Sequence, residues 1–219
     1  MRYSYFLLLC LLTLASCSGN NKKEVPVEVK EEEDNLLKLG EYADSFQYKN
    51  LSKFDIDSLE WEERPNYYTR LDEDAFNMVW HADSTQVFSE SPSLSNYFYS
   101  TQNRNTNFKE ITVLTQSDGC CTNLWYMIYD KEGKFIDKFS VASKGADGSW
   151  YAYSTGKFID YNNYILTSVN HELAEVYEWD ERKEVFDCDS TITQFTIGKD
   201  GVVTEKNVLR ESYKKEVVQ

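Results

Sequence analysis

Residues 126–139 read Tyr-Met-Ile-Tyr-Asp-Lys-Glu-Gly-Lys-Phe-Ile-Asp-Lys-Phe, and this stretch decides the fold. Two runs rich in aromatic and β-branched residues flank a polar loop at residues 130–133. Gly133 stands where a tight loop between antiparallel strands requires a positive φ, which glycine adopts without steric cost. The stretch therefore predicts a β-hairpin.

Similar patterns stand on both sides of this hairpin. Residues 195–197 lead through Gly-Lys-Asp-Gly into residues 202–203, and residues 156–159 turn at 160–163 into residues 164–169. Further aromatic and β-branched runs stand at residues 97–99, 111–114 and 124–129. Short strands at this spacing are typical of an antiparallel meander. We predict a mainly β protein of about eight or nine strands, arranged as a sandwich, an open barrel, a partial propeller-like sheet or an open sheet.

The N-terminal third of the predicted domain lacks this pattern. Residues 71–80 read Leu-Asp-Glu-Asp-Ala-Phe-Asn-Met-Val-Trp, which is typical of a short capped helix. Asp72 is the expected N-cap, and Glu73 and Asp74 are favourable at the positive end of the helix dipole. We therefore expect short helices and irregular segments before the meander.

A secretory signal occupies residues 1–16. Arg2 supplies its positive charge, and the apolar run at residues 5–12 is too short to span a bilayer about 30 Å thick. The signal closes on Leu14-Ala15-Ser16-Cys17, which resembles the lipobox of bacterial lipoproteins. The resemblance implies that Cys17 becomes the mature N-terminus, is thioether-linked to diacylglycerol and is then N-acylated, with palmitate as a typical chain.

Residues 17–35 are expected to be the acylated cysteine and a flexible tether, because residues 18–34 are polar and charged without periodic apolar positions. Two acyl chains suffice for stable membrane anchoring. In the lipoprotein family, a residue other than Asp after the acylated cysteine implies the outer membrane; Ser18 stands there, and the leaflet is left open. Residues 36–219 then form a single β-rich domain.

The chain is strongly acidic: 37 Asp and Glu against 23 Lys and Arg give a formal net charge of −14. Such a charge repels nucleic-acid phosphates and anionic lipid headgroups, so we expect no nucleic-acid partner and a membrane contact through the lipid alone. The charge favours solubility. The alternative is an acidic face for a cationic partner or for divalent ions.

Three cysteines remain in the predicted domain: Cys120, Cys121 and Cys188. Export to an oxidising compartment favours a disulfide, and we predict a bridge from Cys188 to Cys121 or Cys120. Such a bridge closes a loop of about 68 residues and stabilises the fold by roughly 3–5 kcal/mol. The alternatives are an adjacent Cys120–Cys121 disulfide and a catalytic thiol, which is disfavoured because no base is close in sequence.

Histidines and acids give no recognisable metal or catalytic motif. His81 and His171 stand outside any zinc-ligand spacing, and the acidic pairs match no calcium-binding loop. The sequence has no phosphate loop, no Gly-x-Ser-x-Gly elbow and no His-Glu-x-x-His motif. We predict no catalytic residue, no metal site and no cofactor. A pair of carboxylates brought together in space, as in glycosidases, is the alternative.

Aromatic residues are the best ligand-binding candidates. Trp150, Tyr151 and Tyr153 lie on one predicted strand, with Trp125 and Trp179 on neighbouring strands. Side chains alternate along a strand, so Trp150 faces one side of the sheet and the two tyrosines face the other. One of these faces can stack on a sugar or on a peptide side chain, and core packing is the alternative.

Residues 95–210 are also similar to a loose group of uncharacterised β-rich lipoproteins from Gram-negative bacteria. The shared features are Tyr-Asp-Lys-x-Gly-Lys hairpins, here residues 129–134, and aromatic strands. No activity can be transferred from that group. We predict a lipid-anchored interaction or binding protein of the cell envelope, a non-catalytic accessory subunit of an outer-membrane complex. A glycan-binding surface lipoprotein and a carboxylate-dependent hydrolase are the alternatives.

Overall fold

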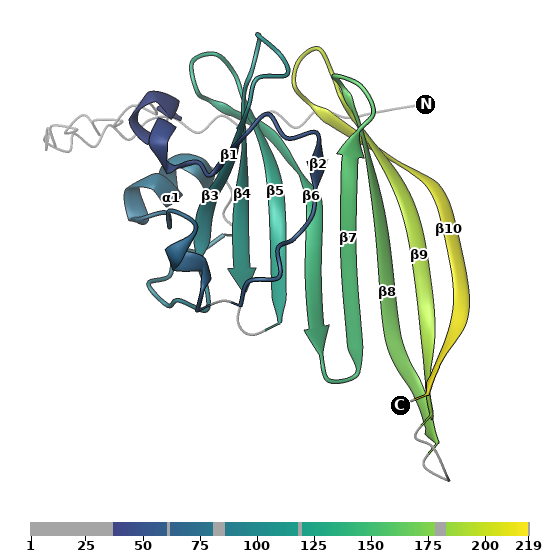
Figure 1. Ribbon diagram of the computed structural model, residues 1–219. Helices are drawn as coiled ribbons and strands as arrows, with labels where there is room; N and C mark the ends of the chain where they lie inside the picture. The colour runs from purple at the N-terminus through teal and green to yellow at the C-terminus, as the bar shows by residue number, and fades with distance from the viewer. Residues whose placement is uncertain (1–36, 61, 81–85, 118–119, 178–182, 219) are drawn as a thin grey trace, which may run out of the picture. The chain divides into compact units, whose positions relative to one another are not determined.

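The computed structural model describes residues 37–60, 62–80, 86–117, 120–177 and 183–218. The predicted signal peptide, the lipidation site Cys17, the tether, His81 and Trp179 lie outside these residues. The elements, of which η denotes a 3₁₀ helix, are η2 (Leu39–Ser45), β1 (Tyr48–Lys49), β2 (Lys53–Phe54), η3 (Arg64–Asn66), α1 (Glu73–Trp80), β3 (Asn96–Gln102), β4 (Lys109–Ser117), β5 (Cys121–Tyr129), β6 (Phe135–Asp147), β7 (Trp150–Phe158), β8 (Asn163–Tyr177), β9 (Lys183–Ile197) and β10 (Val203–Val218) (Figure 1).

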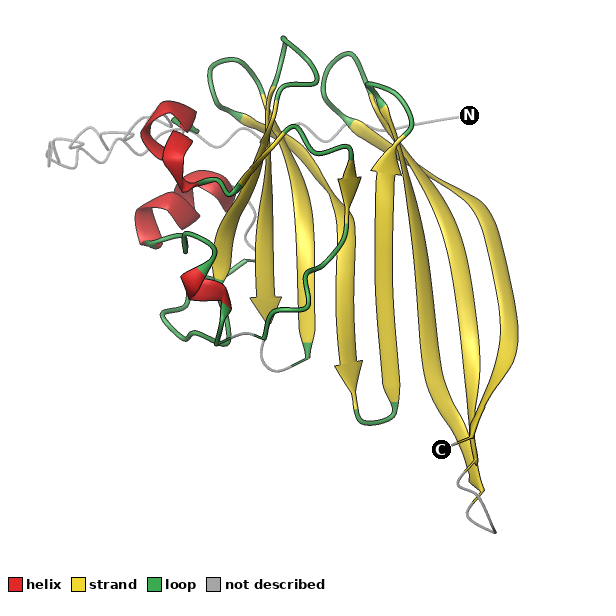
Figure 2. Ribbon diagram, in the orientation of Figure 1, coloured by secondary structure: helices red, strands yellow, loops and turns green. Residues whose placement is uncertain are grey.

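The ten strands of the described chain belong to one open sheet (Figure 2). Strands β3 to β10 are antiparallel and neighbour one another in sequence order, which confirms the predicted mainly β meander. Two short strands extend it: β1 pairs with β3 in parallel, and β2 pairs with β7. The sequence analysis did not predict these two additions, because two-residue strands carry no alternation that a pattern could reveal.

The predicted hairpin loops contain the expected glycines at positive φ. Gly133 has φ 107° and Gly201 has φ 83°. In the first loop, Oδ1 of Asp130 accepts hydrogen bonds from the backbone N–H groups of Gly133 and Lys134, both at 2.8 Å. An aspartate that bonds to its own turn closes the loop tightly. Loop chemistry therefore sets the register of both hairpins.

Helix α1 begins as the sequence predicts. Oδ1 of Asp72 accepts a hydrogen bond from the backbone N–H of Ala75 at 2.8 Å, which is the geometry of an N-cap. Together with η2 and η3, α1 confirms the expected short helices of the N-terminal third. No helix within the described residues is long and apolar enough to cross a membrane.

Strands β3 to β5 bury side chains on both faces. The face that we call the α1 face packs on α1 and on the segment before it, through Phe98, Ile111, Val113, Met127 and Tyr129. The Tyr129 hydroxyl donates a hydrogen bond to the carbonyl oxygen of Val79 at 2.8 Å and ties β5 to the helix. The opposite face forms a second, aromatic-rich core with β2, β7, β8 and β9.

The second core curls the sheet toward itself. The rings of Phe139 on β6 and Phe195 on β9 stack with centroids 4.9 Å apart. The backbone N–H of Val203 donates to Oδ2 of Asp137 at 2.8 Å. These contacts join elements that are not neighbours in the sheet, although among the described strands β10 is the last in the sheet order and has a neighbour on one side.

The ends of β7 to β10 nearest the β8–β9 connection are largely exposed. Side chains on both faces of these strands remain exposed, among them Tyr153, Val176, Leu209 and Tyr213. Every side chain of β10 from residue 204 to residue 216 is exposed. Most side chains at this end of the sheet are therefore exposed, unlike at the β3–β5 end, although His171 and Cys188 are buried there.

Candidate functional site

A pocket of about 520 Å³ lies on the α1 face, beside the segment where β6 pairs with β7. Its volume is typical of small-ligand sites. Two indole rings, Trp125 and Trp150, contribute to its walls. The polar residues that line it are Gln86, Asn96, Thr115, Gln116, Ser117, Thr122, Asn123, Ser143 and Lys144. We call this site the tryptophan pocket.

Cross-strand register brings the polar side chains together. Asn123 on β5 pairs with Thr115 on β4 and with Ser143 on β6, so three adjacent strands present a polar group to the same face. In the next row, Gly145 pairs with Ala152. Because these two residues are small, the sheet surface recedes there, and the indole of Trp150 lies over Gly145.

Two amide groups of the lining differ in what they offer to a ligand. Oδ1 of Asn96 is buried and has no hydrogen-bond partner within the described residues. Oδ1 of Asn123 accepts a hydrogen bond from the Ser140 hydroxyl at 2.6 Å, so its amide nitrogen remains as a donor for the pocket. A ligand hydroxyl can accept from the Asn123 nitrogen, whereas Oδ1 of Asn96 has under 1 Å² of accessible surface and is out of a ligand's reach in this conformation.

The two tryptophans are held by neighbours. Trp150 lies across Gly145, where a Cβ atom would be 2.9 Å from Cη2 of the indole and 3.3 Å from Sγ of Cys121. Trp125 meets Trp80 of α1 edge to face, with centroids 6.3 Å apart, and Nζ of Lys138 lies 4.7 Å from its ring centroid. Both rings are half-buried. Ring faces fixed in this way lose little freedom when a ligand stacks on them.

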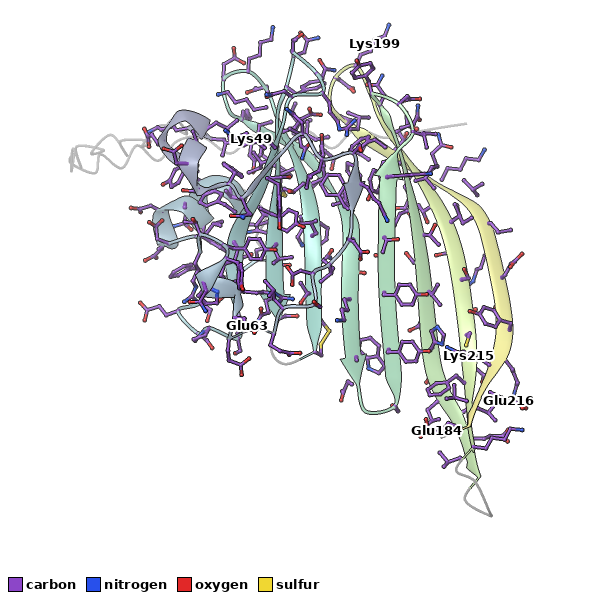
Figure 3. The ribbon with its side chains drawn as sticks, viewed as in Figure 1. Lys49, Glu63, Glu184, Lys199, Lys215 and Glu216 are labelled. Carbon is purple, nitrogen blue, oxygen red and sulfur yellow. A yellow bond between two sulfur atoms is a disulfide. The ribbon has the colours of Figure 1, made fainter. Side chains whose placement is uncertain are left out.

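The disulfide prediction for Cys188 is wrong. Cys120 and Cys121 are joined to each other, at the start of β5, while Cys188 on β9 is free and buried. Strands β5 and β9 are four places apart in the sheet, a separation of about 19 Å at 4.8 Å per strand, whereas disulfide-linked Cα atoms are at most about 7 Å apart. Figure 3 shows the disulfide as a yellow bond at the start of β5, and Cys121 lines the tryptophan pocket.

The predicted aromatic group is divided between two faces. Trp150 and Trp125 share the tryptophan pocket, but Tyr151 and Tyr153 lie on the opposite face, as strand alternation predicts. Tyr151 stacks on His171 with ring centroids 4.0 Å apart. The exposed fraction of Tyr153 is 46%, and this residue is outside the pocket. Of the described members of this group, the two tryptophans therefore share one candidate site.

Sequence reasoning missed a contact between the free thiol and an imidazole. Sγ of Cys188 lies 3.3 Å from Nδ1 of His171, on the neighbouring strand. Burial raises the pKa of the Cys188 thiol. Burial, together with the positive charge of Lys215, lowers the pKa of His171. Both shifts favour the neutral thiol and the neutral imidazole.

A second pocket, of about 190 Å³, lies on the opposite face behind the disulfide. Its floor contains Arg64, which is only 4% exposed. Nη1 of Arg64 donates to Oε1 of Gln116 at 2.7 Å and to Oγ1 of Thr122 at 2.9 Å. Both of these partners also line the tryptophan pocket. Because strand alternation turns the Gln116 and Thr122 side chains toward Arg64 and away from the α1 face, these hydrogen bonds stabilise the second pocket rather than the polar wall of the tryptophan pocket.

Acidic side chains are absent from the described lining of the tryptophan pocket. The Asp187 and Asp189 carboxylates instead make exposed ion pairs at the largely exposed end of the sheet, with Lys214 at 3.6 Å and Arg210 at 3.4 Å. Across the described residues, no three His, Cys, Asp or Glu side chains gather as a metal site would require. The pocket is thus a neutral, aromatic and amide-lined site.

In comparisons with protein-family models, curated proteins and solved structures, the chain matches none of them. The functional argument therefore rests on the geometry of the tryptophan pocket.

Proposed function

We propose that this chain is a lipid-anchored binding protein of the cell envelope whose tryptophan pocket takes a neutral saccharide. The observation that carries the proposal is the combination of Trp125 and Trp150 with the amide of Asn123 in one pocket. A sugar ring has apolar C–H faces and a rim of hydroxyl groups. Indole rings stack on the C–H faces of a sugar, and amide groups form hydrogen bonds with its hydroxyl groups.

Charge supports a neutral ligand. Lys144 is the one charged residue in the described lining, and it pairs with Tyr153, so its side chain lies on the face opposite the pocket. A strongly anionic or cationic ligand would need an opposing charge cluster to offset its desolvation. Asn123 supports a hydroxyl ligand in particular, because its amide nitrogen remains as a donor once its oxygen is bonded to Ser140.

The pocket favours binding over hydrolysis. The two-carboxylate mechanism of glycosidases needs a pair of acids roughly 5–10 Å apart at the scissile bond. The described lining of the pocket contains no Asp or Glu. We therefore propose a non-catalytic role, either at the surface or as the accessory subunit of an outer-membrane complex.

The proposed location follows from the lipobox-like residues 14–17, which would attach the chain to a membrane through Cys17. Metabolic labelling with a fatty-acid analogue tests this part alone. Cys17→Ala should abolish incorporation of the label. Incorporation that persists in the variant would contradict lipidation at Cys17.

A glycan array probed with the purified full-length protein tests the binding function. Trp150→Ala should weaken the affinity for the retained glycan by about tenfold or more, which corresponds to the loss of about 1.4 kcal/mol or more of binding free energy. Tyr153→Ala is the matched control, because this aromatic residue lies on the same strand but on the opposite face. Equal affinity of the Trp150 variant and the wild type, or no retained glycan at all, would refute the proposal.

A further inference from the structure

Strand β10 is an edge strand with exposed side chains along most of its length. It is the last strand in the sheet order, and its side chains from residue 204 to residue 216 are all exposed. Figure 3 shows the labelled Lys215 and Glu216 on this outermost strand. An edge strand of this length presents a row of backbone N–H and C=O groups that can pair with another strand.

The charge pattern of residues 209–217 is self-complementary. The stretch reads Leu-Arg-Glu-Ser-Tyr-Lys-Lys-Glu-Val. When it is laid antiparallel to a copy of itself with Tyr213 at the centre, Arg210 meets a glutamate and Glu211 meets a lysine. Leu209 meets a valine, and Ser212 meets a lysine. Each pair occurs twice because the arrangement is twofold symmetric.

We propose that a second copy of this chain pairs with β10 in this register, continuing the sheet across a twofold axis at Tyr213. On one face Arg210 lies opposite Glu216 of the partner subunit. On the other face Glu211 lies opposite Lys215 of the partner subunit. Residues directly opposite in an antiparallel pair share a face, and the two members of each pair satisfy this because their distances from Tyr213 are equal.

Charge selects this register over its neighbours. A shift of the centre by half a residue or one residue toward the N-terminus sets Arg210 opposite Lys215 or Lys214. A half-residue shift the other way sets Glu211 opposite Glu216, and a full residue sets Lys214 opposite itself. Like charges directly opposite in a sheet are destabilising. The Tyr213-centred register has no like charges directly opposite within the nine-residue stretch, although Lys214 lies diagonal to Lys214 of the partner subunit.

Charged edge strands usually prevent edge-to-edge association, because identical strands bring like charges together. Here the charged residues of two copies attract each other in the Tyr213-centred register, whereas the neighbouring registers place like charges opposite each other. The charge pattern therefore favours pairing of β10 with a second copy in this one register.

Three of the four charged side chains in these pairs already have partners within the chain, Arg210 with Asp189, Lys215 with the Tyr151 hydroxyl at 3.2 Å and Glu216 with Lys183 at 2.7 Å, so pairing between copies must share or replace these contacts. Arg210 lies 3.4 Å from Asp189 and its side chain is 71% exposed, so its guanidinium can also reach a partner carboxylate.

Sedimentation equilibrium of the full-length protein in a mild detergent tests the proposal. The wild type should be a dimer. Glu211→Lys alone sets lysine against lysine, and Lys215→Glu alone sets glutamate against glutamate, so each should raise the dimer Kd by about tenfold or more. An equimolar mixture of the two variants should dimerise again, because both opposite-charge pairs form in the heterodimer.

Lys206→Glu is the matched control, since Lys206 is an exposed residue of β10 outside the self-complementary stretch. It should leave the Kd unchanged. A monomeric wild type at the highest soluble concentration would overturn the proposal. Single variants that dimerise as tightly as the wild type, or a mixture that stays monomeric, would overturn this register.

Discussion

Trp150 lies across Gly145 on the adjacent strand, and this close approach depends on the missing side chain of Gly145. A Cβ atom there would stand 2.9 Å from Cη2 of the indole. The clash would be with a side chain, so the ring can move aside while the backbone keeps its place. The tryptophan pocket thus depends on a residue that offers no functional group of its own.

Gly145→Ala should therefore separate binding from stability. We expect the displaced indole to weaken affinity for the array-selected glycan by about tenfold, with the unfolding free energy changed by less than about 1.5 kcal/mol. Isothermal titration and urea unfolding measure the two quantities. Gly40→Ala is the control, because nothing lies within 4 Å of its added Cβ. Unchanged affinity in the Gly145 variant would show that the Trp150 position does not matter.

Removal of the α1 cap should cost stability without touching the pocket lining. Asp72→Ala deletes the acceptor for the Ala75 N–H, and we expect a loss of about 1 kcal/mol in unfolding free energy. Asp72→Asn should restore most of this, because asparagine caps as well as aspartate does. Urea denaturation followed by circular dichroism measures both. Equal losses in the two variants would point to the charge rather than to the cap.

The hydroxyl of Tyr129 should contribute measurably to the packing of α1. Tyr129 is fully buried, and its hydroxyl is bonded to the Val79 carbonyl oxygen. Tyr129→Phe removes the donor, and we expect a loss of about 1–2 kcal/mol, because a buried carbonyl oxygen loses its side-chain partner. Tyr153→Phe, at an exposed position, should change stability by less than about 0.5 kcal/mol. Similar effects of both changes would argue against the helix-to-strand bond.

Local sequence signals predicted the meander well. Gly133 and Gly201 marked hairpin loops, and Asp72 marked the helix start, because each effect acts within a few residues. Alternation along β7 also placed Trp150 and Tyr151 on opposite faces. What such signals cannot give is the distance between strands that are not neighbours in sequence, and the Cys188 bridge failed for that reason.

The pocket itself was predicted only in part. Trp125 and Trp150 stood out as large aromatic residues, but Asn96 and Asn123 look like ordinary polar strand positions. Their convergence depends on the registers of β3 to β6, which include bulges in the β3–β4 and β5–β6 pairs. A bulge shifts every later pair by one residue and leaves little trace in composition. The His171–Cys188 contact was missed because the register of the β8–β9 hairpin was not predicted.

The last prediction is a pH dependence of stability that arises from the buried imidazole of His171. Burial and Lys215 lower the pKa of His171 from its ordinary value of 6.5, so the unfolded chain binds a proton more readily than the folded protein does. The stabilising contribution is complete above the unfolded-state pKa near 6.5. It is lost as the pH falls from there toward the lower pKa of the folded state.

His171→Phe keeps an aromatic ring next to Tyr151 but cannot titrate. Between pH 8 and pH 5 the wild type should therefore lose more unfolding free energy than the variant, with the divergence confined to the region below about pH 6.5. Urea unfolding at closely spaced pH values measures this. Subtracting the variant's unfolding free energy from that of the wild type at each pH removes the contribution of the carboxylates that both proteins share. Parallel curves across the whole range would mean that the His171 imidazole protonates as readily in the folded protein as in the unfolded chain.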